Sequence, residues 1–132
     1  MESEFDRKVA ALVKKEPRYR PEAYYFVAEA VNFTVARREQ AGHVSAAELL
    51  DGMRDFAAGK YGVVGQIVLN DWGLITEADA GEAVYLLIGV GLLRASEDDR
   101  PEDFATGRPL FPRLPMFRAV RRKSDVLPFI DA

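Results

Sequence analysis

Residues 72–94 read WGLITEADAGEAVYLLIGVGLLR and hold the densest group of local structure signals in the chain. Gly73 suits the end of one helix, because glycine readily adopts the left-handed conformation that closes it. Thr76 is followed three residues later by Asp79, so a hydroxyl and a carboxylate are placed to satisfy free amides of a helical first turn. The sequence therefore predicts a capped helix from Thr76 to about Gly91.

The order of elements around this helix is that of a winged helix-turn-helix. In that fold a short helix ends at a Gly-Leu turn, the next helix recognises the nucleic acid, and a Gly-Leu-Leu step leads into the wing. Residues 73–74 and 91–93 follow this spacing, although a tight helical bundle shows the same signals. DNA binding through this helix is disfavoured, because its first turns would bring Glu77, Asp79 and Glu82 against phosphates.

Apolar residues at helical spacing upstream predict more helices, so we assign the chain to the mainly α class as a compact bundle of about five helices. The first helix is expected to begin near Phe5 and to stop at Pro17. The second is expected to run from Pro21 to Gly42 and to be the central helix, because its polar strip is narrow. The strip consists of Glu22, Glu29, Asn32 and Glu39.

The clearest capping box is Ser45-Ala-Ala-Glu48, which predicts the start of a third helix. This helix is expected to stop between Gly59 and Gly62. Apolar residues then indicate a short fourth helix over residues 64–72.

Helical periodicity is lost after the helix that begins at Thr76. Residues 92–94 could begin a short strand, and an acidic loop is expected over residues 96–103. Five of the seven prolines lie beyond residue 100, so we expect irregular structure with one small hairpin at most. We divide the chain into one helical domain, residues 1–104, and a Pro/Arg-rich tail, residues 105–132, that is packed on the domain or partly flexible.

Composition narrows the range of functions. The 132 residues are 48% hydrophobic and 30% charged, as in an ordinary globular domain, and the absence of cysteine excludes disulfides, thiolate metal sites and a cysteine nucleophile. The longest uncharged stretch, residues 83–93, is about half the length of a membrane span. The first residues, MESEFDRK, lack an apolar signal core, so we expect a cytoplasmic protein without a membrane span.

No residue is assigned a catalytic, cofactor-binding or metal-binding role, and we expect the protein not to be an enzyme. His43 is the only histidine and is interpreted as a loop residue before the third helix. The acidic residues 97–103 lack the spacing of a calcium loop, and no glycine pattern matches a phosphate-binding loop. An enzymatic function would require Glu29, Asn32 or His43 to meet another polar side chain in a pocket.

Charge is distributed unevenly along a chain whose net charge is −3. Residues 76–104 carry eight acidic and two basic residues, whereas residues 105–132 carry six basic and two acidic residues. Neighbouring patches of opposite sign steer encounters and select partners. The candidate partner-binding residues are Glu77, Asp79, Glu82, Arg118, Arg121, Arg122 and Lys123.

These patches predict a non-enzymatic protein-protein interaction module. The acidic segment 76–104, or the basic and apolar tail 118–130, would bind an unknown protein or a second copy; the two patches could equally neutralise each other. The alternative function is a winged-helix-like nucleic-acid-binding protein that contacts phosphates through the basic tail. The apolar residues 126–130 either fold back on the core or dock on a partner, and the sequence leaves both open.

A set of short motifs over residues 5–104 resembles a small family of conserved hypothetical bacterial proteins of the planctomycete and verrucomicrobial type. The motifs are Glu16-Pro-Arg-Tyr19, Ala23-Tyr24, Phe26-Val27, His43-Val-Ser45, Glu48-Leu49-Leu50, Trp72-Gly73, Thr76-Glu77, Gly81-Glu82, Gly91-Leu92-Leu93 and Glu102-Asp103-Phe104. The resemblance implies no activity, cofactor or partner. It implies that the acidic start of the helix at Thr76 is a trait of the family.

Overall fold

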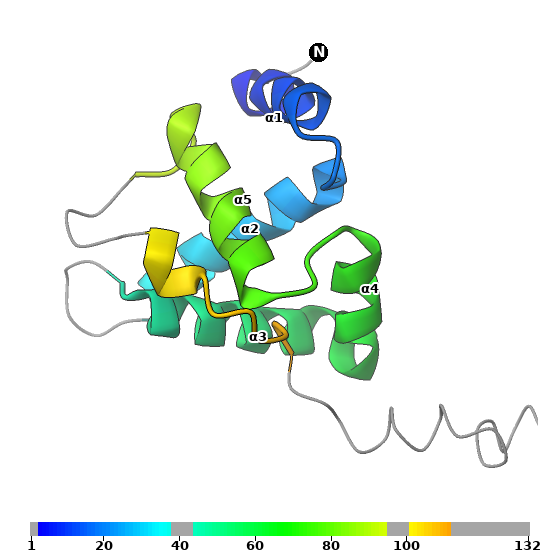
Figure 1. Cartoon of the computed structure of the whole chain (residues 1–132), viewed down its shortest axis with the longest axis vertical. Helices are drawn as coiled ribbons and strands as arrows, with labels where there is room; N and C mark the ends of the chain where they lie inside the picture. The colour runs from blue at the N-terminus through cyan, green and yellow to red at the C-terminus, as the bar shows by residue number, and fades with distance from the viewer. Residues whose placement is uncertain (1–2, 38–43, 95–100, 112–132) are drawn as a thin grey trace, which may run out of the picture.

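The computed structural model describes residues 3–37, 44–94 and 101–111, and this part of the chain is mainly helical, as the sequence predicts. In Figure 1, α3 runs along the lower side of the molecule, α2 and α5 lie above it, α4 stands at one end and α1 covers the top. The elements are α1 (Glu4–Lys15), α2 (Pro21–Ala36), α3 (Ala46–Tyr61), the 3-10 helix η1 (Gly62–Val64), α4 (Gly65–Asp71), α5 (Glu77–Gly89) and the 3-10 helix η2 (Pro101–Phe104). Among the described residues, no helix has the length and apolar character that a membrane crossing requires.

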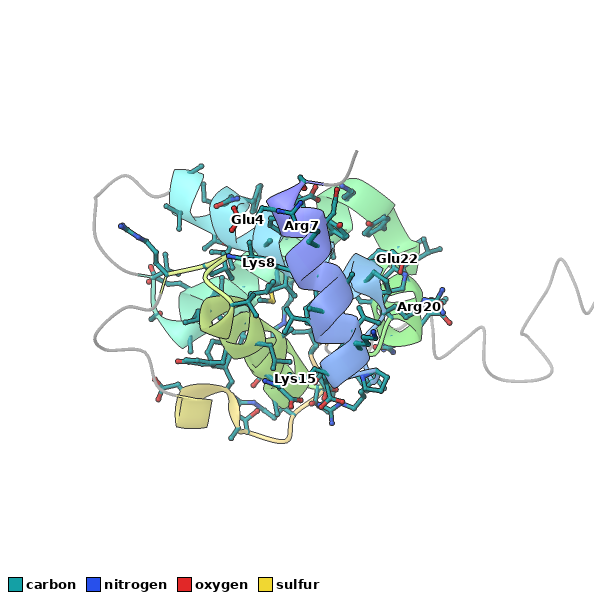
Figure 2. The ribbon with its side chains drawn as sticks, turned by 90° about the horizontal axis from the view of Figure 1, so that it is seen from above. Glu4, Arg7, Lys8, Lys15, Arg20 and Glu22 are labelled. Atoms are coloured by element: carbon teal, nitrogen blue, oxygen red, sulfur yellow. The ribbon has the colours of Figure 1, made fainter. Side chains whose placement is uncertain are left out.

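α1 is stabilised at its start by a capping box that the sequence analysis missed. The backbone amide of Asp6 donates to Ser3 Oγ at 3.0 Å, and the Ser3 amide donates to the Asp6 carboxylate at 3.3 Å. Glu4 and Lys8 form an ion pair of 3.0 Å near the same end, where Figure 2 labels both residues. The helix ends at Lys15, just before the predicted stop.

α2 is the central helix, as its narrow polar strip predicts, because it packs against α1, α3 and α5. It begins at Pro21, as expected. It ends at Ala36 with Arg37 as its cap, so the predicted end at Gly42 is wrong; Gly42 itself lies outside the described residues. The physical reason is that the charged residues after Ala36 provide no apolar side chain to bury, and packing rather than propensity extends most helices.

The segment after α5 does not form the expected strand at residues 92–94. The amides of Leu92 and Gly91 instead donate to Leu87 and Ile88 carbonyls at 2.9 and 3.0 Å, which closes the end of α5. Gly91 has φ +83°, the left-handed conformation that such helix ends require. These bonds leave no extended backbone there for pairing with a second strand.

Residues 104–111, called the strap below, return across the start of α5. Phe104 and Leu110 anchor the strap, with 4% and 0% of their surfaces exposed. An isolated antiparallel bridge joins Thr76 to Pro109. The strap is therefore packed on the helices, and residues 112–132 lie outside the described part of the chain.

α2 and α3 approach each other closely where Gly52 of α3 faces Thr34 of α2. A Cβ atom on Gly52 would lie 1.8 Å from Thr34 Oγ1, far inside van der Waals contact. Thr34 has no room to withdraw, because it is 2% exposed and its hydroxyl donates to the Ala30 carbonyl at 2.7 Å. The pair therefore sets the distance between the central helix and α3.

Replacing Gly52 with alanine should lower the free energy of unfolding by about 1–3 kcal/mol, because the added methyl group forces α2 and α3 apart. Alanine is a better helix former than glycine, so helix propensity alone would predict that the substitution raises the free energy of unfolding. Gly59→Ala in the same helix is the matched control: nothing lies within 4 Å of its Cβ position, and it should stabilise by about 0.5–1 kcal/mol. Urea denaturation of both variants checks the prediction, and equal stabilisation of the two would contradict it.

Candidate functional site

Glu77 is a predicted partner-binding residue, and the structure places its side chain inside the protein at 7% exposure. Its Oε2 accepts a hydrogen bond from Arg54 Nη2 at 2.6 Å. Its Oε1 accepts from Thr106 Oγ1 at 2.6 Å and from Arg108 Nε at 3.3 Å. One carboxylate therefore joins α5 to α3 and to the strap, and little of it is accessible to a partner.

Opposing effects determine the pKa of Glu77. Burial is the largest of them and raises the pKa, whereas hydrogen bonds from Thr106 and Arg54 and the charge of Arg108 lower it. The net result is a pKa below the usual 4.5. The carboxylate is charged at neutral pH, and its place in the first turn of α5 also favours that charge.

Asp79 and Glu82 face the connection between α1 and α2. Asp79 accepts from the Thr76 amide at 2.9 Å and completes the predicted capping box. Arg18 Nη2 lies 3.2 Å from Asp79 Oδ1 and also pairs with Glu82, whose carboxylate accepts from the Tyr19 hydroxyl at 2.6 Å. These acids therefore have a cationic partner already, and it comes from the α1–α2 connection. Their binding of another protein stays a prediction.

Of the other predicted residues, Glu29 lies in a groove beside Lys60, whereas Asn32 does not line that groove. Glu29 and Asn32 are both exposed on α2, and Glu29 Oε1 pairs with Lys60 Nζ at 3.2 Å. No group of three or more His, Asp or Glu side chains is placed to hold a metal ion in the described ranges. The residues that lie outside the described part are His43, Arg118, Arg121, Arg122 and Lys123.

A groove floored by aromatic rings lies where α2 meets the ends of α3 and α4, and we call it the aromatic groove. It has a volume of about 260 Å³, and its rings belong to Tyr25, Phe26, Tyr61 and Trp72. Tyr61 and Trp72 meet edge to face, with centroids 5.8 Å apart and planes at 82°. Phe26 is 3% exposed and lies 6.4 Å from each of these two rings, so it supports them from the core.

The rim of the aromatic groove carries two exposed carboxylates. Glu22 lies 3.6 Å from Arg20 Nε, and Figure 2 shows the two residues together at the start of α2. Glu29 is held by Lys60, which also lines the groove. Exposed ion pairs contribute about 0–1 kcal/mol, so another cation can exchange with these two. Aromatic faces beside carboxylates favour a guanidinium or ammonium group.

Large aliphatic side chains are exposed on η1 and α4, close in sequence to the groove residues Tyr61 and Trp72. Val63, Val64 and Ile67 are 56%, 46% and 55% exposed, and we call them the η1–α4 apolar surface. Grouped apolar side chains at the surface of a domain indicate a docking site.

The apolar residues around α4 predict a helix, but the sequence did not indicate that several of them would be exposed. α4 has seven residues, fewer than two full turns, and it buries only Gly65 and Leu69. The available signal was a run of five large apolar residues within 63–69, more than so short a helix can bury.

Comparisons of the chain with protein-family models, with curated proteins and with solved structures found no match.

Replacing Glu77 with glutamine should lower the free energy of unfolding by about 1–3 kcal/mol at neutral pH, because Arg54 and Arg108 lose a charged acceptor. The folded pKa lies below the unfolded value of 4.5, so the charged form stabilises the fold fully above that pH. The stabilisation is lost as the pH falls through the folded pKa. Wild type and Glu77→Gln should therefore converge in stability upon acidification.

Asp51→Asn is the matched control, since Asp51 also pairs with Arg54, at 3.1 Å, but its side chain is 69% exposed. This change should alter stability by less than about 1 kcal/mol at any pH. Thermal or urea unfolding from neutral to acidic pH measures both variants. If the difference in unfolding free energy between wild type and Glu77→Gln stays constant with pH, the charge of the carboxylate does not contribute to that difference.

Proposed function

We propose that this chain is a non-enzymatic protein-protein interaction module that docks its partner on the aromatic groove and the η1–α4 apolar surface. The observation that carries the proposal is the exposure of Val63, Val64 and Ile67. Burying such side chains in an interface gains about 25 cal/mol per Å² of apolar surface. The neighbouring Trp72 and Tyr61 are of the residue types that contribute most to binding energy in interfaces.

The chemistry of this surface specifies the kind of partner. The apolar surface favours aliphatic or aromatic side chains, and the aromatic groove with Glu22 and Glu29 on its rim favours a cation. Arginine suits the groove better than lysine, because its planar guanidinium stacks on rings and bonds a carboxylate at the same time. We therefore propose that the partner contributes a short segment containing arginine and large apolar residues.

A winged-helix-like relation of α4, the turn at residues 72–75 and α5 remains our proposal for the topology of this half of the fold. It gives little support to nucleic-acid recognition through α5. Only Glu82 and Gly89 of that helix are exposed, and a recognition helix must present a polar face to the groove of the duplex.

Selection of peptides from a random display library on the immobilised full chain tests the proposed function. Peptides that combine arginine with large apolar residues should be enriched. Ile67→Asp should weaken their binding about tenfold or more, because a charge in the docking face leaves the peptide's apolar side chain against a carboxylate.

Val35→Asp is the matched control, since Val35 is 50% exposed on α2 and does not line the groove. It should leave the affinity of the selected peptides unchanged. Selected peptides that bind Ile67→Asp and wild type equally, or that are acidic rather than basic, would refute the proposed docking surface. Circular dichroism of both variants confirms that the fold is retained.

A further inference from the structure

The strap fixes the point from which residues 112–132 depart. The Leu110 amide donates to the Ile75 carbonyl at 2.9 Å, and its carbonyl accepts from Arg54 Nε at 2.5 Å. Ile75 lies three residues after Trp72, which lines the aromatic groove. In Figure 1 the strap, in orange, ends over α3 on the side toward α4. The described chain therefore ends beside Ile75, three residues in sequence from the groove residue Trp72.

The sequence that follows the strap has the composition that this surface favours. Arg121, Arg122 and Lys123 supply cations, and three residues after Lys123 begins the sequence 126–130, VLPFI, which supplies four large apolar side chains. The groove supplies aromatic faces and carboxylates, and the apolar surface lies between the groove residues Tyr61 and Trp72 in the sequence. Both parts of the segment thus have a counterpart, in a matching arrangement of charge and apolarity.

We infer that residues 121–130 of this chain dock on the aromatic groove and the η1–α4 apolar surface of the same molecule, and that a partner must displace them. The inference deepens the proposed function and rests on the same surface. An arginine of the segment enters the groove between Trp72 and the rim carboxylates. The apolar residues 126–130 cover Val63, Val64 and Ile67.

Reach and tethering both favour docking within one molecule. The ten residues 112–121 span up to about 35 Å when extended, whereas a domain of this size has a radius of gyration of about 13 Å. A segment tethered by so short a linker has an effective concentration in the millimolar range, so even a weak site is occupied.

A second copy is the poorer occupant, because a stable dimer needs about 800 Å² from each partner. Three aliphatic side chains beside a 260 Å³ groove suit a short segment instead.

Docking of this segment would regulate partner binding by competition. A partner segment of the same chemistry gains access only to the fraction of molecules whose groove is open, which reduces its apparent affinity. Neutralising or modifying the segment would raise that fraction. The chain would thus carry its own competing ligand.

Trp72 is the only tryptophan of the chain and lines the groove, so its fluorescence reports occupancy directly. Acrylamide quenching of Trp72 is measured in the full chain and in the double variant Leu127→Asp/Phe129→Asp. We expect a larger quenching constant in the variant, because the docked segment no longer shields the ring. A synthetic peptide of residues 118–132, added to the variant, should restore the shielding.

The matched control is Leu114→Asp/Phe117→Asp, which makes the same exchanges in residues 112–132 but outside the docking segment. It should leave quenching as in the wild type. Equal quenching of Trp72 in the wild type and in Leu127→Asp/Phe129→Asp would overturn the inference. So would shielding that appears only at high protein concentration together with a dimer in light scattering, because the occupant would then be a second copy.

The failure of this inference is distinguishable from that of the proposed function. If selected peptides lose binding to Ile67→Asp while tail variants leave Trp72 quenching unchanged, the docking surface stands and the self-docking is wrong. If Trp72 is shielded by the segment but no peptide is selected, the self-docking stands and the partner function is wrong. If both stand, Leu127→Asp/Phe129→Asp should bind the selected peptides about tenfold more tightly than wild type, since a competitor at millimolar effective concentration is removed.

Discussion

The packing of α2 against α1, α3 and α5 at the same time is the constraint on which the other features of the structure depend. A helix enclosed on three sides can expose only a narrow strip, and in α2 that strip contains Glu22, Tyr25 and Glu29. The close approach at Gly52 and Thr34 fixes α3 against α2 and thereby sets where α3 ends. The aromatic groove forms at this end, because Tyr61 finishes α3 beside the strip of α2.

Charge in the C-terminal half of the described fold is used mainly for internal bonding. Acidic residues at the start of α5 would repel one another and destabilise the helix if they were left without cations. Arg18, Arg54 and Arg108 come from three different segments and supply those cations. The buried carboxylate of Glu77 is stabilised most, because it accepts hydrogen bonds and its negative charge is also balanced by arginines. The same bonds hold the strap on α5 and so determine where the chain leaves the fold.

The proposed docking surface follows from the shortness of α4. A helix of seven residues can turn one narrow side toward the core, so the aliphatic residues on its other sides and on η1 stay exposed. Such exposure costs solubility unless another segment covers it. In the proposed function a partner covers this surface, and in the self-docked state residues 121–130 cover it.

The sequence by itself determined the helical class, the starts of α2, α3 and α5, and the strip of α2 that stays exposed. These features are local: a capping box or an apolar stripe acts within a few residues and can be recognised in one segment. Even there, two features escaped prediction. Packing decided the end of α2, and backbone bonding in the folded state decided the loss of the strand at residues 92–94.

Only the tertiary structure decided which charges are paired and which apolar residues remain outside. Glu77 and Glu22 are both acids in the first turn of a helix, yet the first is buried among arginines and the second is exposed on the groove rim. Val64 and Leu69 both belong to one apolar run, yet the first is exposed and the second is fully buried. The sequence does not distinguish the buried from the exposed member of either pair, because burial depends on which distant segments pack against a helix. The hydrophobic pattern of the helix itself does not report those contacts.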